Sequence, residues 1–218
     1  PYNWEADKGQ RTILLKIKKK RPDAVFEAFS NSAPYWMTYS GCAAGNEDPL
    51  KDNLKPEYYE MFCDYLLDVC KHYKTTYQID FKTLEPFNES FSDYWYAEGS
   101  QEGCHFEPES QMKIIRMLYP KLKATGLNTL LSASDETNLR HFLTVQKAYQ
   151  TAGDIWDKLG QLNTHKKYEG SSDNPANLSG NQKQVPAKDK DWKATSCSPR
   201  SYSTTCGSCA RKPGSTGN

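Results

Sequence analysis

Two glutamates, Glu85 and Glu89, stand four residues apart in the segment Thr-Leu-Glu-Pro-Phe-Asn-Glu-Ser, residues 83–90. Paired carboxyl groups can cleave a glycosidic linkage, one as proton donor and the other as nucleophile or base. They must lie about 5–5.5 Å apart for retention of configuration and about 6.5–9.5 Å apart for inversion. Four residues of extended chain span about 13 Å. Glu85 is therefore expected to be a support residue, and Glu89 needs a partner from another strand.

Two other interpretations of this segment compete with catalysis. Two acids at the end of a strand are most often plain surface charges. Residues 88–90 also form an N-glycosylation sequon, Asn-Glu-Ser. A glycan on Asn88, however, would block a pocket that contains Glu89. An exposed carboxylate at the carboxyl end of a barrel strand is catalytic far more often than average, which favours Glu89 as a catalytic acid.

The cysteines and histidines predict neither a metal site nor a cofactor. Cys206 and Cys209 have CxxC spacing, but zinc needs further Cys or His ligands at matching spacing. The four histidines are scattered, and none lies in the C-terminal tail. Cys63 and Cys70 are predicted to lie on one helix, where their Cα atoms would be about 10 Å apart, too far for a disulfide.

Charge and hydropathy exclude several classes of partner. The chain has 28 basic and 27 acidic residues, so neither nucleic acid nor an anionic membrane is a predicted partner. The one basic run, residues 16–21, is typical of a solvated helix C-terminus. No apolar run approaches the roughly 20 residues that span a bilayer. The 14 Tyr and five Trp suit either a carbohydrate groove or core packing, and composition alone does not decide between them.

The hydrophobic pattern predicts helices that alternate with strands. Helices are expected at residues 4–20, 53–73 and 110–124, and one helix or a pair of helices at residues 134–159. Strands are expected at residues 24–29, 77–84, 128–133 and 160–165. This order predicts an α/β fold with βαβ units and a parallel sheet. Polar residues follow each strand, where a TIM barrel keeps its site, and the glycine-rich first turn of a dinucleotide-binding sheet is absent. The pattern ends at Gly170.

Five motifs occur in the order expected for one known family. The chain resembles glycoside hydrolase family 30, and most of all its fungal endo-β-1,6-galactanase branch, in the segments FEAFSNSAPYWMTYSG, LEPFNES, GSQEGCHF, SASDE and GQLNTH. The resemblance implies an incomplete (β/α)8 TIM barrel, roughly strands three to six, within residues 1–169. Residues 170–218 are then a low-complexity or disordered tail.

The resemblance also implies an activity. It points to retaining hydrolysis of a polysaccharide, β-1,6-linked galactan such as arabinogalactan side chains, by a secreted monomer. The sequence itself contains no signal peptide and does not begin with Met.

Site residues follow from the same motifs. The resemblance assigns the acid/base role to Glu89 and places the Asn88 amide at the sugar 2-hydroxyl. His165 matches a polar position after the sixth strand, with a solvent-exposed loop histidine as the simpler alternative. The substrate-binding residues predicted in this way are Asn31, Trp36, Asn88, Glu102 and His165.

The second catalytic carboxylate is not visible in this sequence. The nucleophile of the family is a Glu after the seventh strand, and the chain has no Glu after Glu169. In a faint match at residues 190–197, Thr195 stands where the nucleophile would be. The 218 residues alone are therefore expected to be poorly stable and impaired in activity. The alternative function is a carbohydrate-binding fragment without catalysis.

Overall fold

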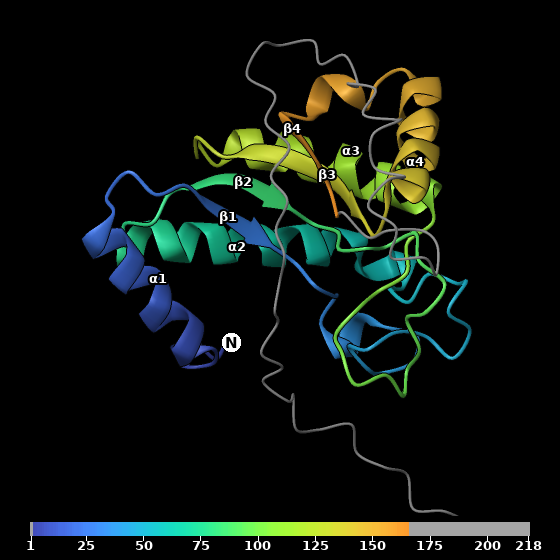
Figure 1. Ribbon diagram of the computed structural model, residues 1–218, viewed down its shortest axis with the longest axis horizontal. Helices are drawn as coiled ribbons and strands as arrows, with labels where there is room; N and C mark the ends of the chain where they lie inside the picture. Colours follow the sequence, from blue (N-terminus) through green and yellow to red (C-terminus); the bar gives the residue numbers. More distant parts are fainter. Residues whose placement is uncertain (1, 166–218) are drawn as a thin grey trace, which may run out of the picture.

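Four parallel strands form the centre of the molecule (Figure 1). The computed structural model describes residues 2–165, so the predicted tail, its CxxC pair and the domain boundary near residue 170 lie outside the described residues. The strands are β1 (Phe26–Phe29), β2 (Phe81–Glu85), β3 (Leu130–Glu136) and β4 (Gln161–Thr164), and they neighbour one another in chain order. The predicted α/β class with a parallel sheet is confirmed.

Three of the four described helices connect the strands and cover one face of the sheet. The helices are α1 (Lys8–Lys20), α2 (Tyr59–Tyr77), α3 (Pro108–Ala124) and α4 (Leu139–Ala152), with short 3₁₀ turns at Tyr35–Met37, Pro56–Tyr58 and Trp156–Lys158. Helix α1 precedes β1, and α2, α3 and α4 are the connecting helices. Helices α2 and α3 pack against each other, and α4 packs against β3 and α3. Each connection therefore returns the chain to the same end of the sheet, so all four strands point one way. No helix within residues 2–165 is long and apolar enough to cross a membrane.

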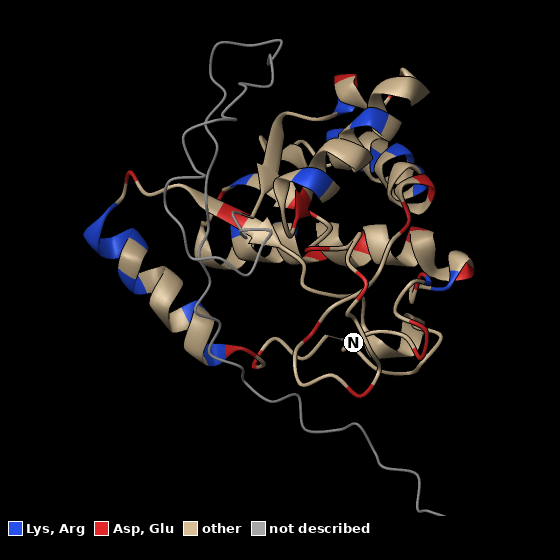
Figure 2. Ribbon diagram, turned by 45° about the vertical axis from the view of Figure 1, so that its right-hand side comes forward, with Lys and Arg blue, Asp and Glu red and all other residues tan. Residues whose placement is uncertain are grey.

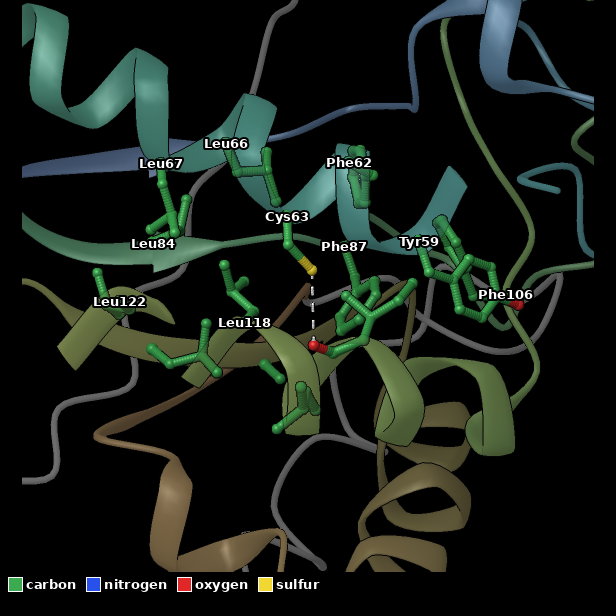
Figure 3. Packing of buried hydrophobic residues seen from close by; sticks show 14 of the residues in the cluster. Tyr59, Phe62, Cys63, Leu66, Leu67, Leu84, Phe87, Phe106, Leu118 and Leu122 are labelled. Atoms are coloured by element: carbon green, nitrogen blue, oxygen red, sulfur yellow. Dashed lines mark hydrogen bonds between the residues drawn. The ribbon is translucent and has the colours of Figure 1, made fainter. Parts of the chain in front are cut away.

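The core lies between α2 and α3 and over the sheet (Figure 3). The buried stripe of α2 consists of Phe62, Cys63, Leu66, Leu67 and Cys70. Val69 and Tyr73 of the same helix are only half-buried. Across from it, α3 buries Ile114, Ile115, Leu118 and Leu122, and the Cys63 thiol points at the Ile114 carbonyl. Cys63 and Cys70 are both free thiols, as their predicted spacing required.

Helix α1 confirms the interpretation of the basic run. Lys18, Lys19 and Lys20 form its last turn, where cations complement the helix dipole (Figure 2). None of its residues is buried, and Ile13 and Ile17 are 60% and 41% exposed.

Two predicted boundaries at strand ends are wrong. Ser134, Asp135 and Glu136 suggested a capped helix start, but they continue β3. Helix α4 starts only at Leu139, where the Asn138 side chain accepts a hydrogen bond from a backbone N–H in the first turn. The signals are alike because a polar residue followed by acids suits both a helix N-terminus and the polar end of a barrel strand.

Two other predicted boundaries shift. Helix α2 runs on to Tyr77, into the segment predicted as a strand, and ends at Gln78 in the left-handed conformation. Strand β2 accordingly begins at Phe81. Helix α3 continues through Pro120 without a break. The helical stretch predicted to reach residue 159 consists of α4, which ends at Ala152, and the 3₁₀ turn at Trp156–Lys158.

The packing of α3 allows the effect of two substitutions on the free energy of unfolding to be predicted. Leu118 is fully buried, whereas its neighbour Met117 is 41% exposed. Leu118→Ala should lower the free energy of unfolding by about 2–5 kcal/mol, because it removes apolar contacts and leaves a cavity. Met117→Ala, the matched control, should change it by about 0.5 kcal/mol or less. Urea denaturation followed by circular dichroism measures both, and equal losses would contradict this orientation of α3.

Candidate active site

Three polar residues meet where β2, β3 and β4 end. Glu89 follows β2 by a short turn, Asp135 is the second-last residue of strand β3, and His165 comes directly after β4. Parallel strands end at the same edge of a sheet, so residues far apart in sequence become neighbours there. The Glu89 N–H donates to the Asp135 carbonyl at 2.9 Å, and the His165 N–H donates to the Glu136 carbonyl at 2.8 Å.

Glu89 is held in an unusual backbone conformation. Its φ is 48°, in the left-handed region that non-glycine residues seldom adopt. Its carbonyl accepts a hydrogen bond of 2.9 Å from the indole Nε1–H of Trp95. The Trp95 ring lies so close to Gly103 that a Cβ there would come within 1.9 Å of a ring atom. Gly103 therefore makes room for the ring that supports the Glu89 backbone.

The Glu89 carboxyl group is bound by two side chains. Its Oε1 lies 2.6 Å from Nδ1 of His165, and the side chain is only 4% exposed. Its Oε2 accepts a hydrogen bond from the Tyr94 hydroxyl. That hydroxyl also lies 2.6 Å from the Thr137 Oγ1. The carboxyl group thus has an imidazole on one oxygen and a phenol on the other.

His165 bridges two carboxyl groups. Its Nε2 lies 3.0 Å from Oδ2 of Asp135, on the opposite side of the ring from Glu89. Burial alone would lower the pKa of His165, but hydrogen bonds from its ring to Asp135 and Glu89 and their negative charges raise it to about 9. His165 is therefore an imidazolium at neutral pH. Burial raises the pKa of Asp135, and the hydrogen bond with His165 opposes that effect.

Glu136 supports the loop that follows Glu89. It is fully buried, and its Oε2 accepts from the Phe91 N–H at 2.9 Å. Its Oε1 accepts from the Gln111 side chain of α3 at 3.3 Å. Burial raises the pKa of Glu136 to about 7. The carboxyl group therefore ties the loop after β2 to helix α3.

A second acid cluster on the sheet contains the buried Glu85 and the half-buried Glu27. The Asn163 Nδ2 donates to Glu27 Oε1 at 2.9 Å and to Glu85 Oε2 at 3.1 Å. Glu27 also accepts hydrogen bonds from the hydroxyls of Thr83, at 2.7 Å, and Ser132, at 2.9 Å. Burial and the charge of Asp135 raise the pKa of Glu85 well above its usual range. This geometry agrees with the expectation that Glu85 is a support residue.

Asn88 has an unsatisfied polar atom. The residue is 5% exposed, and its Oδ1 accepts no hydrogen bond from the described residues. A buried acceptor without a donor is costly, so a ligand hydroxyl at this position would bind favourably. The burial of Asn88 also leaves little space for a glycan, in line with the view that the sequon is incidental.

A family model described as O-Glycosyl hydrolase family 30 matches residues 1–184. The chain belongs to this family. The matched residues include every described strand and helix of the chain. The four strands β1 to β4 are therefore part of the family's barrel. The fold predicted from the motifs, a partial (β/α)8 barrel, is thereby confirmed.

Named relatives of this family 30 chain include two enzymes. It is 37% identical over 135 residues to an endo-beta-1,6-galactanase of Hypocrea rufa, covering 62% of this chain and 28% of that protein. It is 26% identical over 225 aligned positions to an exo-beta-1,6-galactobiohydrolase of Bifidobacterium longum subsp. longum, covering 83% of this chain and 14% of that protein. The chain therefore spans less than a third of either relative.

A solved structure supports the same fold. The catalytic domain of the family 30 xylanase C from Talaromyces cellulolyticus superposes with a TM-score of 0.63 at 18% sequence identity. The likeness covers 76% of this chain and 38% of the xylanase domain. At this level of identity the likeness shows the fold alone.

The structure places the predicted family 30 site residues in two groups. Asn88, Glu89 and His165 lie together at the ends of β2 and β4, and His165 is half-buried, with its side chain 10% exposed, rather than an exposed loop residue. Asn31 and Trp36 are exposed in the segment after β1, where the Trp36 ring stands edge-on to Tyr35 at 5.3 Å. The binding roles of these residues stay predictions.

Glu102 belongs to neither group and lies in the loop between β2 and α3. It is exposed and has Asp7 as a charged neighbour. Its substrate-binding role also stays a prediction.

Three residues of the site were missed by sequence reasoning. The sequence pattern predicts a helix from residue 134 onward, which makes Asp135 and Glu136 helix residues, and it gives Tyr94 no role beyond that of one aromatic residue among several. The signal for the two acids was available, because the motif Ser-Ala-Ser-Asp-Glu at residues 132–136 is one of the five family motifs. The contact of Tyr94 with Glu89 depends on a loop path that no local pattern predicts.

The buried Glu136 predicts a pH dependence of stability. Its pKa is about 7 in the folded chain and about 4.3 when unfolded. Between these values the unfolded state has released the proton while the folded state retains it, so stability falls as pH rises. The loss should amount to roughly 3 kcal/mol by pH 7. Glu136→Gln should remove this contribution and make the fall in stability shallower, as measured by urea denaturation from pH 4 to pH 7. Part of the fall should remain, because the pKa values of the buried Glu85 and Asp135 are also raised.

The exposed Glu98 provides a matched control for this slope. Glu98→Gln removes a carboxyl group of the same kind from the surface, and it should keep the wild-type pH slope. Glu136→Gln should also be less stable than the wild type at low pH, because its amide has one acceptor oxygen and cannot accept from both the Phe91 N–H and Gln111. This loss does not depend on pH and is distinct from the slope. An unchanged slope in Glu136→Gln would show that the buried carboxyl group does not titrate in this range.

Proposed function

We propose that this chain is the acid/base-bearing part of a retaining glycoside hydrolase of the endo-β-1,6-galactanase type. The observation that carries the proposal is the Glu89 carboxyl group, buried at the carboxyl end of β2 with His165 2.6 Å from one of its oxygens. Proton donors of glycosidases are carboxylic acids in such desolvated sites at strand ends. Family membership supports the reaction class.

Glu89 acts first as an acid and then as a base in this mechanism. As the glycosidic bond breaks, it donates a proton to the leaving oxygen while a second carboxylate attacks the anomeric carbon. It then takes a proton from the water that hydrolyses the glycosyl-enzyme. The Asn88 Oδ1, which lacks a donor in the ligand-free site, accepts from the sugar 2-hydroxyl in both steps.

The proposed substrate is β-1,6-linked galactan, such as the side chains of arabinogalactan. Support comes from the names of both relatives, an endo-beta-1,6-galactanase and an exo-beta-1,6-galactobiohydrolase. The exposed rings of Tyr35 and Trp36, in the same segment after β1 as Asn31, offer apolar faces on which sugar rings stack. A polymer of this kind is reached outside the cell, so we propose a secreted, monomeric protein without nucleic-acid or membrane partners.

A second candidate function is carbohydrate binding without catalysis. The family nucleophile follows the seventh barrel strand, whereas β1 to β4 correspond to strands three to six. The ends of β1 to β4 therefore do not supply the nucleophile, which favours binding without catalysis. A site with Glu89 but no nucleophile would hold sugar through Asn88 and the aromatic rings and cleave it slowly. The two functions make different predictions for the same substitution.

Glu89→Gln separates these functions. On soluble β-1,6-galactan, reducing-sugar release by the 218-residue chain should be low and should fall about 100-fold or more in the variant, because the proton donor is lost. Binding of a β-1,6-galacto-oligosaccharide, measured by calorimetry, should stay nearly unchanged. Release that is equal in the two proteins, with binding intact, would favour the binding function.

Substrate choice needs its own controls. Glu98→Gln on the surface should behave as wild type in both assays. Xylan, the polymer that the name of the structurally similar xylanase indicates as its substrate, should be neither bound nor cleaved by this chain. Preference for xylan over β-1,6-galactan would refute the proposed substrate and leave the reaction class intact. Turnover at the level of a complete family enzyme would refute the expected impairment.

A further inference from the structure

We propose that Asp135 and His165 form a positioning pair that restricts the catalytic proton of Glu89 to its Oε2 atom. Oε1 then serves only as a hydrogen-bond acceptor, and the leaving oxygen is protonated from the side of Tyr94. The proposal rests on the acid/base role proposed for Glu89 and adds the choice of oxygen. It also replaces the predicted sugar-binding role of His165 with one that acts through Glu89.

The first step concerns the protons of His165. Both ring nitrogens face carboxyl oxygens, Nδ1 toward Glu89 at 2.6 Å and Nε2 toward Asp135 at 3.0 Å. A carboxylate only accepts hydrogen bonds, so both nitrogens carry a proton when both acids are ionised. The His165 pKa of about 9 agrees with this doubly protonated state. An N–H on Nδ1 occupies Oε1 of Glu89 and excludes a proton from that oxygen.

The second step concerns Asp135, which fixes Glu89 in two ways. Its carbonyl accepts the Glu89 N–H at 2.9 Å, and its carboxyl group orients the imidazole that holds the Glu89 side chain. Its φ of 49° matches the φ of 48° at Glu89, so two strained residues face each other across the strand ends. Such strain persists only where surrounding contacts over-determine the backbone, as at active sites.

The third step concerns Oε2, whose neighbour can change its hydrogen-bond role. The Tyr94 hydroxyl lies against Oε2 and against Thr137 Oγ1, which in turn lies 2.6 Å from the Ser92 hydroxyl. Hydroxyls both donate and accept. When Glu89 is ionised, Tyr94 donates to Oε2; when it is protonated, Oε2–H donates to Tyr94, which then donates to Thr137. A proton is therefore accommodated on Oε2 and not on Oε1.

Tyr94 also indicates where the leaving sugar lies. Its residue is 39% exposed, although its hydroxyl touches the buried Glu89. The leaving oxygen must approach Oε2 and displace the Tyr94 hydroxyl from it. The ring of Tyr94 is thus placed beside the sugar on the leaving-group side.

Other charges surround this pair. Asp135 interacts with Glu27 below it and with Glu89, and its charge also acts on Glu85 and Glu136. Tyr94 keeps its proton, because burial and the hydrogen bond to Glu89 raise its pKa. His165 supplies the positive charge that offsets Glu89 and Asp135 in this group. Removing the charge of Asp135 therefore acts on Glu89 mainly through His165.

Nuclear magnetic resonance of the ring nitrogens tests the pair directly in the 218-residue chain. The His165 signals are assigned by their loss in His165→Gln. In the wild type, both ring nitrogens should carry protons at neutral pH and titrate near pH 9. In Asp135→Asn, the titration should fall by about one to two pH units, because a carboxylate partner has been lost. A single neutral tautomer at neutral pH in the wild type would overturn the proposal without any variant.

The pH profile of hydrolysis supplies the second readout. A cation beside a carboxyl group lowers its pKa. Because His165 should lose its proton at a lower pH in Asp135→Asn, Glu89 should lack its neighbouring cation over that range and have a higher pKa there than in the wild type. The alkaline limb of kcat/KM on β-1,6-galactan should then move up by about one pH unit. A rate lowered equally at every pH, with the limb unmoved, would mean that Asp135 has only a structural role.

Controls separate this proposal from the proposed function. Asp93→Asn, an exposed aspartate in the same loop as Tyr94, should change neither the titration of His165 nor the pH profile. If His165 titrates as expected but no galactan is cleaved or bound, the proton arrangement stands and the proposed function fails. If galactan is cleaved while His165 is neutral at neutral pH, the function stands and the positioning pair fails.

Discussion

The hydrogen bond from the Glu89 N–H to the Asp135 carbonyl is the contact on which the site depends. It joins the turn after β2 to the end of β3, and it holds Glu89 in a left-handed conformation that the chain would otherwise avoid. From that backbone position the Glu89 side chain reaches His165 at the end of β4. A shift of one strand relative to the next would break all of these contacts together, so sheet register and site geometry are one constraint.

The electrostatics of the site follow from burial. Glu27, Glu85, Asp135 and Glu136 stand on three neighbouring strands, and the pKa values of the last three are raised chiefly by the loss of water. Acids in such surroundings either keep their protons or acquire a cation or strong donors. In this chain the cation is His165, which lies beside Asp135. The donors are the Asn163 amide, which lies between Glu27 and Glu85, and the Phe91 N–H and Gln111 amide, which bind Glu136.

Sequence reasoning succeeded where a local pattern had one physical meaning. The alternation of helices and strands could give only a parallel sheet, and the position of Asn88 and Glu89 after a strand placed them at its functional edge. It failed where one pattern had two meanings. Ser134, Asp135 and Glu136 satisfy the rules for a capped helix start, and only the pairing of β3 with β4 makes them strand residues. The pairing of Tyr94 and His165 with Glu89 could not be predicted, because both contacts are tertiary and no local period encodes them.

The inner face of this sheet also departs from what barrel packing alone would select. Barrel interiors are usually filled with branched apolar side chains in layers. Here Glu27 accepts from Thr83, Ser132 and Asn163, one donor from each of the other three strands. Each of these buried polar groups costs free energy unless it is bonded, and a well-packed apolar layer would be as stable or more so. The polar layer fixes the relative register of all four strands through one carboxyl oxygen, directly below the residues that must meet at Glu89. The chain therefore gives up apolar packing beneath the site in return for a fixed arrangement of the strand ends above it.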